Sequence, residues 1–139
     1  MTIQHHIPSL YIHIPFCISK CIYCDFNSIV TKSQIVDEYL NAIEQELQST
    51  TGKRSFKTVF IGGGTPTALN ETQLDRLLNI ISKHVDVTNL KEYTIEVNPG
   101  TLSDEKVIIV KNSHVDRISI GIQSFNDRYL KLLGRIHSA

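Results

Sequence analysis

The chain has 139 residues, 41% of them hydrophobic, and its 14 lysines and arginines balance its 14 aspartates and glutamates. This length allows one domain with a real core, but it excludes a complete eight-unit β/α barrel, which needs about 250 residues. The even charge balance predicts neither a nucleic-acid-binding surface nor a surface for anionic membranes. No apolar run approaches the ~20 residues of a membrane span and no signal peptide is evident. We therefore expect a cytoplasmic protein with a small-molecule partner.

The first predicted unit is a strand, a loop and a helix. Residues 9–16 alternate between apolar and polar side chains, which is the period of a strand. A loop that contains all three cysteines follows. Ser33 is the predicted N-cap of a helix that continues toward Gly52. The apolar positions of this helix are Ile35, Val36, Tyr39, Leu40, Ile43 and Leu47.

The second unit has the clearest pattern. Residues 57–61 predict a strand that runs into the glycines at 62–64. Asn70 and Gln73 have the spacing of a capping box, in which two residues satisfy free backbone amides at the start of a helix. The helix that they open has its apolar stripe at Leu74, Leu77, Leu78 and Ile81.

Two further units follow. The third has a strand at 93–97 and then, from Ser103, a predicted helix whose VIIV run is ambiguous between helix and strand. The fourth has a strand at 117–123 and a helix at 126–133 that ends at Gly134, a typical residue after a helix. Four alternating units without a linker predict an α/β fold with a parallel sheet. The last sheet edge lacks a covering strand, so we expect any barrel to be partial.

Polar side chains share one face of the predicted strands. Parallel strands are ordinarily apolar on both faces, because helices or a packed core cover them. Burying polar groups without partners would cost several kcal/mol, so we expect a polar ligand or water beside this face, at the carboxyl ends of the strands. An open sheet with a solvated face is the alternative. We expect this face to be polar and small throughout: Tyr11 and His13, then Thr94, Glu96 and Asn98, then Ser119, Gly121 and Gln123 opposite Ile118, Ile120 and Ile122.

The three cysteines form the most specific motif. Their spacing, Cys17-x3-Cys21-x2-Cys24, is too tight for a disulfide framework and leaves an odd cysteine. A metal centre explains it better, because three thiolates can hold three irons of a [4Fe-4S] cluster and leave the fourth iron open for chemistry. A zinc site with His13 as the fourth ligand and a cluster of buried core cysteines are the alternatives.

Other features could complete a binding site. The GGGTP run at 62–66 lacks the phosphate-binding patterns of nucleotide sites. Its glycines would let backbone carbonyls approach the ammonium group of a ligand, although a tight turn explains them equally. Glu96 offers an acid, Gln123 a donor and an acceptor, and Arg135 a fork for a carboxylate. Glu96 and Arg135, each taken alone, are also typical of an exposed surface.

Several stretches together carry a family resemblance. YIHIPFCISKCIYCDFNS, IGGGTPT, TIEVNPGTL, RISIGIQSFND and LLGRIHS resemble, in order and spacing, the oxygen-independent coproporphyrinogen III oxidase-like family of radical S-adenosylmethionine proteins. The resemblance covers essentially the whole chain. It implies a partial (β/α) TIM-like barrel of the radical S-adenosylmethionine type with four units present. Residues 1–139 would form the N-terminal part of the core domain, without the C-terminal units and the C-terminal domain.

The resemblance also implies residue roles. Cys17, Cys21 and Cys24 would ligate the [4Fe-4S] cluster. No residue is assigned to catalysis. The residues that would contact S-adenosylmethionine are Tyr11, Tyr23, Gly63, Gly64, Thr65, Glu96, Gln123 and Arg135.

One position separates two branches of this family. The oxidases carry a further cysteine two residues after the third, whereas this chain has Phe26 there and resembles the HemW-type heme chaperone branch. The resemblance implies an iron-sulfur protein that binds heme, delivers it to a respiratory protein, needs an electron donor and has the capacity to cleave S-adenosylmethionine. Oxidative decarboxylation of a porphyrin precursor, a small zinc-binding module and an inactive fragment are the alternatives. Four histidines are candidate heme ligands, and none of them is assigned: His5, His6, His13 and His137.

Overall fold

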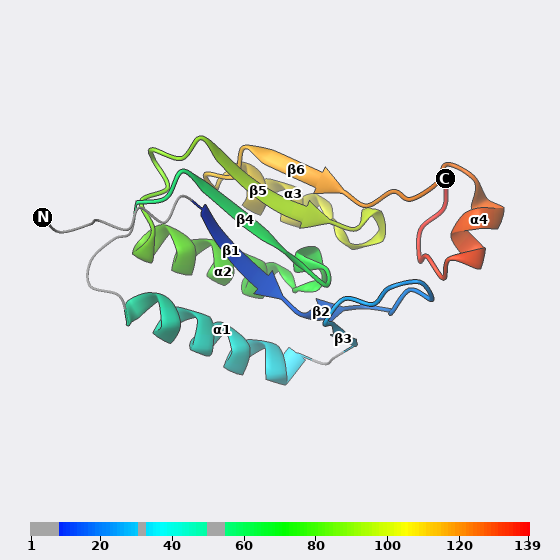
Figure 1. Ribbon diagram of the computed structural model, residues 1–139, viewed down its shortest axis with the longest axis horizontal. Coiled ribbons are helices and arrows are strands. Elements are labelled where there is room, and N and C mark those ends of the chain that lie inside the picture. The colour runs from blue at the N-terminus through cyan, green and yellow to red at the C-terminus, as the bar shows by residue number, and fades with distance from the viewer. Residues whose placement is uncertain (1–8, 31–32, 50–54) are drawn as a thin grey trace, which may run out of the picture.

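The computed structural model describes residues 9–30, 33–49 and 55–139 and, within them, places four parallel strands in one sheet. The sheet order follows the chain, and each strand is followed by a helix before the next one begins (Figure 1). This confirms the predicted α/β fold with alternating units. The strands, in sheet order, are β1 (Ser9–Ile14), β4 (Thr58–Gly63), β5 (Glu92–Val97) and β6 (Arg117–Ile120).

Three helices lie along one face of the sheet, and the fourth lies beyond the carboxyl ends of the strands, beside the cysteine loop (Figure 1). Short 3₁₀ turns follow two of the strands. The two ends of the cysteine loop pair as a second, two-stranded parallel sheet. These elements are α1 (Ser33–Gln48), α2 (Glu71–His84), α3 (Asp104–Lys111), α4 (Asp127–Leu132), η1 (Pro66–Ala68), η2 (Pro99–Thr101), β2 (Phe16–Cys17) and β3 (Ile29–Val30).

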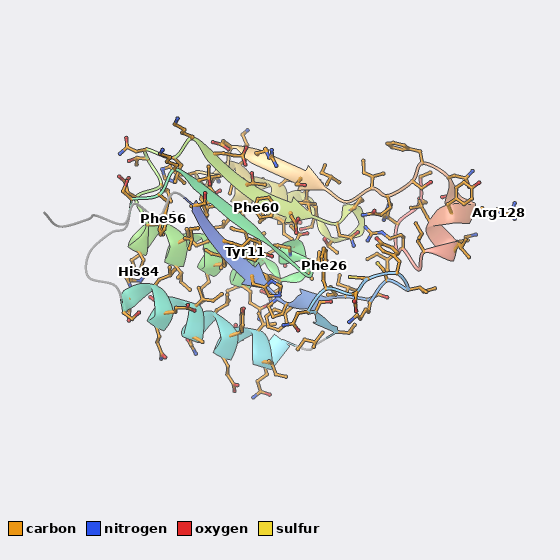
Figure 2. The ribbon with its side chains drawn as sticks, in the orientation of Figure 1. Tyr11, Phe26, Phe56, Phe60, His84 and Arg128 are labelled. Carbon is orange, nitrogen blue, oxygen red and sulfur yellow. The ribbon has the colours of Figure 1, made fainter. Side chains whose placement is uncertain are left out.

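The core lies between the sheet and its helices. The predicted stripe of α2 is buried at all four positions, and the predicted capping box is confirmed: Gln73 N donates to Asn70 Oδ1 at 2.9 Å, and Asn70 N donates to Gln73 Oε1 at 3.3 Å. Figure 2 shows side chains filling the layer between strands and helices. Strand side chains of this layer include Ile12, Ile14, Val59, Ile61, Ile95 and Val97.

The stripe predicted for α1 was wrong at one position. Val36 and Leu40 are buried, but Ile35 is 54% exposed, because one residue along a helix turns the side chain about 100° away. The structure ends this helix at Gln48. The predicted stop at Gly52 and the side chain of the predicted N-cap, Ser33, lie outside the described residues.

The ambiguous segment after Ser103 is a helix. The Ser103 hydroxyl accepts a hydrogen bond from Lys106 N at 3.3 Å and so caps α3. The fourth predicted helix also begins with its cap, since Asn126 Oδ1 accepts from Arg128 N at 3.0 Å. In the part of the chain that the structure describes, no helix is long and apolar enough to cross a membrane.

The fourth strand differs from its prediction. It ends at Ile120 rather than Gln123, and Gln123 has a left-handed backbone with a φ of 66°. Ile118 and Ile120 are 43% and 51% exposed. They were expected on a covered face, but α4 lies beyond the strand ends instead of packing against β6 (Figure 1).

The sequence predicted that one face of the sheet would be polar and small throughout. This was wrong for the face opposite the helices, which is called the open face below. Phe60 of β4 points to this face, and its ring stacks on Tyr11 of β1 with 6.0 Å between centroids. Thr94 is fully buried there, and its hydroxyl donates to Glu92 Oε1 at 2.9 Å. The open face therefore combines an aromatic area with a polar area near the carboxyl ends of the strands.

Candidate functional site

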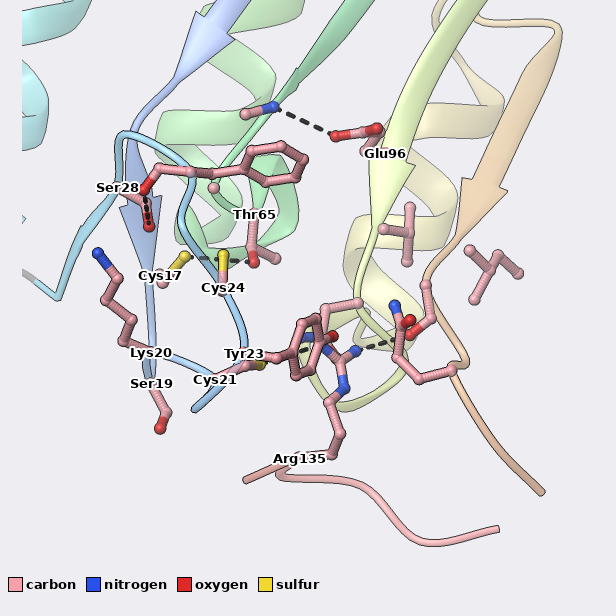
Figure 3. A pocket seen from close by; sticks show the side chains of 18 of the residues that line it. Cys17, Ser19, Lys20, Cys21, Tyr23, Cys24, Ser28, Thr65, Glu96 and Arg135 are labelled. Atoms are coloured by element: carbon pink, nitrogen blue, oxygen red, sulfur yellow. Dashed lines mark hydrogen bonds between the residues drawn. The ribbon is translucent and has the colours of Figure 1, made fainter. Parts of the chain in front are cut away.

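A cavity of about 380 Å³ opens at the carboxyl ends of the sheet strands. The cysteine loop forms one wall, the ends of β4, β5 and β6 form the floor, and Arg135 comes in from the C-terminal segment (Figure 3). All of the predicted site residues except Tyr11 line this cavity. Segments far apart in the sequence therefore meet here because parallel strands bring their carboxyl ends to one edge of the sheet.

The cysteine loop is held at both ends. Phe16 and Cys17 pair with Ile29 and Val30, and Ile29 N donates to Pro15 O at 2.7 Å. Within the loop, the three cysteines are free thiols, each half-buried, and all three line the cavity. Among the described residues, no group of three or more His, Cys, Asp or Glu side chains is arranged to hold a single metal ion.

The glycine run at the end of β4 packs closely against the start of the cysteine loop. Gly63 has a φ of 116°, which other residues rarely adopt. A Cβ on Gly64 would lie 2.7 Å from Phe16 O and 3.0 Å from Cys17 Sγ. Backbone bonds reinforce this contact, since Gly64 N donates to Ile14 O at 2.8 Å and Thr65 N donates to Phe16 O at 2.7 Å. The glycines thus serve a close approach of backbone to backbone at the edge of the cavity.

Glu96 and Thr65 connect the pieces of the site. Glu96 Oε2 accepts a hydrogen bond from Gly63 N at 3.2 Å, and Thr65 Oγ1 donates to Cys17 Sγ at 3.8 Å. The end of β5, the glycine run and the first cysteine are thereby joined.

Arg135 closes the cavity from the opposite side. Its Nη1 donates to Cys21 Sγ at 3.3 Å and its Nη2 donates to Gly121 O at 2.6 Å. Its Nε is buried and, among the described residues, has no hydrogen-bond partner, and the same holds for Oδ1 of Asn98. A buried donor and a buried acceptor without partners favour a ligand that carries both kinds of group.

Tyr23 lies beside Cys21 and Arg135 (Figure 3). Partial burial raises the pKa of its phenol above the usual value, the Arg135 guanidinium lowers this pKa, and the Cys21 thiol raises it. The net direction is upward, so Tyr23 is a neutral hydrogen-bonding group near neutral pH.

Tyr11 lies outside this cavity. It borders a second hollow of about 470 Å³ between β1 and α1, and its hydroxyl hydrogen-bonds Nδ1 of His13 at 3.2 Å. Partial burial raises the pKa of Tyr11, and the charge of Glu96 acts in the same direction. The other ring nitrogen of His13, Nε2, hydrogen-bonds Asn27 O at 2.9 Å. Both nitrogens of His13 thus have partners, and the structure does not present His13 as a fourth ligand beside the cysteines.

The structure adds cavity residues that the sequence did not single out. Ser19, Lys20 and Ser28 line the cavity from the cysteine loop. Lysine and serine are common on surfaces, so their only sequence signal was their place beside the cysteines. Phe26, chosen for its place after the third cysteine, also lines the cavity and is 68% exposed.

Comparisons with known proteins agree with this architecture. A family model described as the radical SAM superfamily matches residues 11–139. The heme chaperone HemW of Bacillus subtilis is 50% identical over 133 residues, which are 93% of this chain and 35% of that protein. The heme chaperone HemW of Escherichia coli is 42% identical over 134 residues, with the same coverage.

A solved structure gives the same result for the fold. Coproporphyrinogen III oxidase (HemN) from Escherichia coli, a radical SAM enzyme, superposes with a TM-score of 0.82 and 34% identity, over 94% of this chain and 31% of that one. The chain therefore spans about a third of the length of the relatives that it matches.

Proposed function

The chain belongs to the radical S-adenosylmethionine superfamily, and from this premise we propose that it acts as a heme chaperone that carries a [4Fe-4S] cluster and binds S-adenosylmethionine. One observation carries the proposal: three free thiols share one cavity with the glycine run, Glu96, Gln123 and Arg135. Reduced thiols suit the cytoplasm. We also propose that the chain corresponds to part of the core domain of a longer protein.

Cys17, Cys21 and Cys24 would hold the cluster. Three thiolate donors fit this group, since they would ligate three irons and leave one iron open for the amine and carboxylate of S-adenosylmethionine. When bound, the reduced cluster supplies one electron for cleavage of the C–S bond of that ligand. The protein contributes the placement of the donors, because the β2–β3 pair holds the loop that carries them.

The remaining cavity residues would bind S-adenosylmethionine. The unpartnered Nε of Arg135 suits the carboxylate of the ligand, and the unpartnered Oδ1 of Asn98 suits an amine or hydroxyl donor. Gly63, Gly64, Thr65, Tyr23 and Gln123 line the same cavity as these two groups. Tyr11 would contribute only from the neighbouring hollow, through the sheet face that it shares with Glu96.

The assignment to heme rests on two observations. The relatives at 42–50% identity are named heme chaperones. Phe26 stands two residues after the third cysteine, where the oxidases of this family carry a further cysteine, and it presents an exposed ring at the cavity. An exposed aromatic side chain suits a flat, largely apolar ligand such as heme. The partners would be an electron donor and a respiratory protein that receives the heme.

The test is reconstitution of the purified chain with iron and sulfide under anaerobic conditions. We expect about four irons and four acid-labile sulfides per chain, an EPR spectrum that changes on addition of S-adenosylmethionine, and heme binding followed by its absorbance. Zinc without acid-labile sulfide would contradict the cluster, and an EPR spectrum that S-adenosylmethionine leaves unchanged would contradict the binding site.

A second function is favoured by the structural match. The solved oxidase shares the fold at a TM-score of 0.82. Anaerobic incubation with coproporphyrinogen III, an electron donor and S-adenosylmethionine separates the two functions. We expect no decarboxylation and retained heme binding, whereas product formation without heme binding would favour the oxidase.

A further inference from the structure

Lys106 is a buried cation that the proposed site does not use. It lies in the first turn of α3 and is 8% exposed. Its Nζ donates to the carbonyl oxygen of Thr67 at 2.9 Å and to that of Thr101 at 3.1 Å. Lysine is almost never buried unless it is paired, so an ammonium held by two backbone carbonyls is an unusual arrangement.

The two carbonyls belong to different loops. Thr67 lies in η1, directly after the glycine run, and Thr101 lies in η2, directly after the end of β5. Both threonines are buried, and their hydroxyls hydrogen-bond each other at 2.5 Å. Lys106 and the two threonines thus form a joint between loops that approach from neighbouring strands.

Each loop is tied to a cavity residue by backbone hydrogen bonds. Ala68 N donates to Thr65 O at 2.8 Å. On the other side, Thr101 donates to Asn98 O from its amide at 2.9 Å and from its hydroxyl at 2.8 Å. Thr65 and Asn98 both line the cavity. A displacement at the joint would therefore change the spacing between two walls of the site.

We propose that Lys106 is a positioning residue, which holds the Thr65 and Asn98 loops at the spacing that S-adenosylmethionine requires. The identity of the ligand rests on the proposed function, whereas the joint itself rests on the contacts above. The loop that carries the cysteines is held by its own β2–β3 pair, and the Thr65 hydroxyl links the joint to Cys17. We therefore expect loss of the joint to affect ligand affinity and the mobility of the two loops more than cluster assembly.

Lys106→Met keeps the length of the side chain and removes the donors. In the reconstituted full chain we expect wild-type iron and sulfide contents and a Kd for S-adenosylmethionine that rises roughly 10- to 100-fold, the scale seen when partners that orient binding groups are removed. Amide hydrogen exchange should become faster in residues 67–69 and in residues 100–102 together. Lys106→Arg keeps a charged donor and should restore part of the affinity.

Val110→Ala is the matched control, because Val110 is a buried residue of the same helix and its truncation destabilises the fold without removing the ammonium. It should leave the Kd and the exchange of the two loops near wild type. Wild-type affinity together with wild-type loop exchange in Lys106→Met would overturn the proposal.

Two further outcomes are also decisive. If Lys106→Met does not fold, the shorter and uncharged Lys106→Gln decides, since an unchanged Kd and unchanged exchange of both loops without the ammonium would overturn the proposal. A wild-type chain that binds the cluster but no S-adenosylmethionine would contradict the proposed function. The exchange rates would then still decide whether Lys106 joins the two loops.

Discussion

Arg135 donates a hydrogen bond to the Sγ of Cys21 at 3.3 Å, although 114 positions of sequence separate the two residues. The same guanidinium donates to Gly121 O at 2.6 Å, and the backbone nearby adds a bond from Ile22 N to Leu133 O at 3.3 Å. The C-terminal segment, the end of β6 and the cysteine loop are therefore joined at one side chain. This contact completes the wall of the cavity.

Replacement of Arg135 by lysine should weaken the binding of S-adenosylmethionine by about tenfold or more. Hydrogen bonds to charged groups contribute about 1.5–3 kcal/mol, and a single ammonium cannot replace the planar set of N–H donors of a guanidinium. The Kd of the reconstituted chain, from the EPR response to added ligand, gives the measurement. Arg128→Lys, an exposed change on α4, is the control and should have no effect. An unaltered Kd in Arg135→Lys would remove this residue from the site.

Gly63→Ala should lower the free energy of unfolding by about 1–3 kcal/mol, the usual cost of a non-glycine residue in a sparsely populated region of φ and ψ. The strain has two sources, because the φ is 116° and the new Cβ would lie 2.7 Å from the His13 ring. Urea unfolding followed by circular dichroism measures the change. Gly100→Ala should be milder, because the nearest atoms to its Cβ would be those of the flexible Ile136 side chain at 3.1 Å. Equal losses in the two variants would contradict the role given to the Gly63 conformation.

The ionisation of the Tyr93 phenol should lower the stability of the folded protein in alkali. Burial raises the pKa of its phenol well above the ordinary 10.0. The unfolded chain releases this proton near pH 10 while the folded chain keeps it, so the stabilisation is complete below pH 10 and falls as the pH rises further. The free energy of unfolding, measured from pH 8 to pH 11, should fall less steeply in Tyr93→Phe than in the wild type. Identical slopes would show that Tyr93 ionises equally in both states.

At neutral pH the same Tyr93→Phe change should be neutral or stabilising. The Tyr93 hydroxyl is buried and, in the described part of the chain, has no hydrogen-bond partner. Removing an unsatisfied buried polar group relieves a cost of about 1–3 kcal/mol. A loss of stability on this change would point to a partner for the hydroxyl.

Leu77→Ala should destabilise the fold by about 2–5 kcal/mol, the range for truncation of a fully buried leucine. Leu77 is fully buried between α2 and the sheet. Leu132→Ala is the matched control, because Leu132 on α4 is 71% exposed and should change stability by no more than about 0.5 kcal/mol. Thermal unfolding of both variants gives the comparison, and a large loss in Leu132→Ala would show that the outer face of α4 is packed.

Local patterns made most of the architecture predictable. Alternation in residues 9–14, the helical stripe of α2 and the capping box formed by Asn70 and Gln73 each depend on neighbours within a few positions. The cysteine spacing likewise depends only on local sequence, and it indicated a cluster rather than a disulfide. These features were sufficient for the order of the elements and for the family.

Other features depend on contacts that no local pattern contains. The exposure of Ile118 and Ile120 follows from the place of α4 beyond the strand ends, and β6 ends at Ile120, three residues before the left-handed Gln123 beside the cavity. The position of Tyr11 in a neighbouring hollow depends on its stacking against Phe60 of the adjacent strand. Each of these outcomes is set by which neighbour occupies the adjacent space.

The cavity shows most clearly which features the sequence determines and which depend on the tertiary structure. The sequence by itself determined which chemical groups are present, because three thiols, an acid, an amide and a guanidinium can be read residue by residue. Only the tertiary structure decided which groups meet: Arg135 with Cys21, Glu96 with Gly63, and Lys106 with the two loops behind them. The reason is that parallel strands bring the ends of distant segments to one edge, so these contacts depend on strand order and register rather than on local spacing.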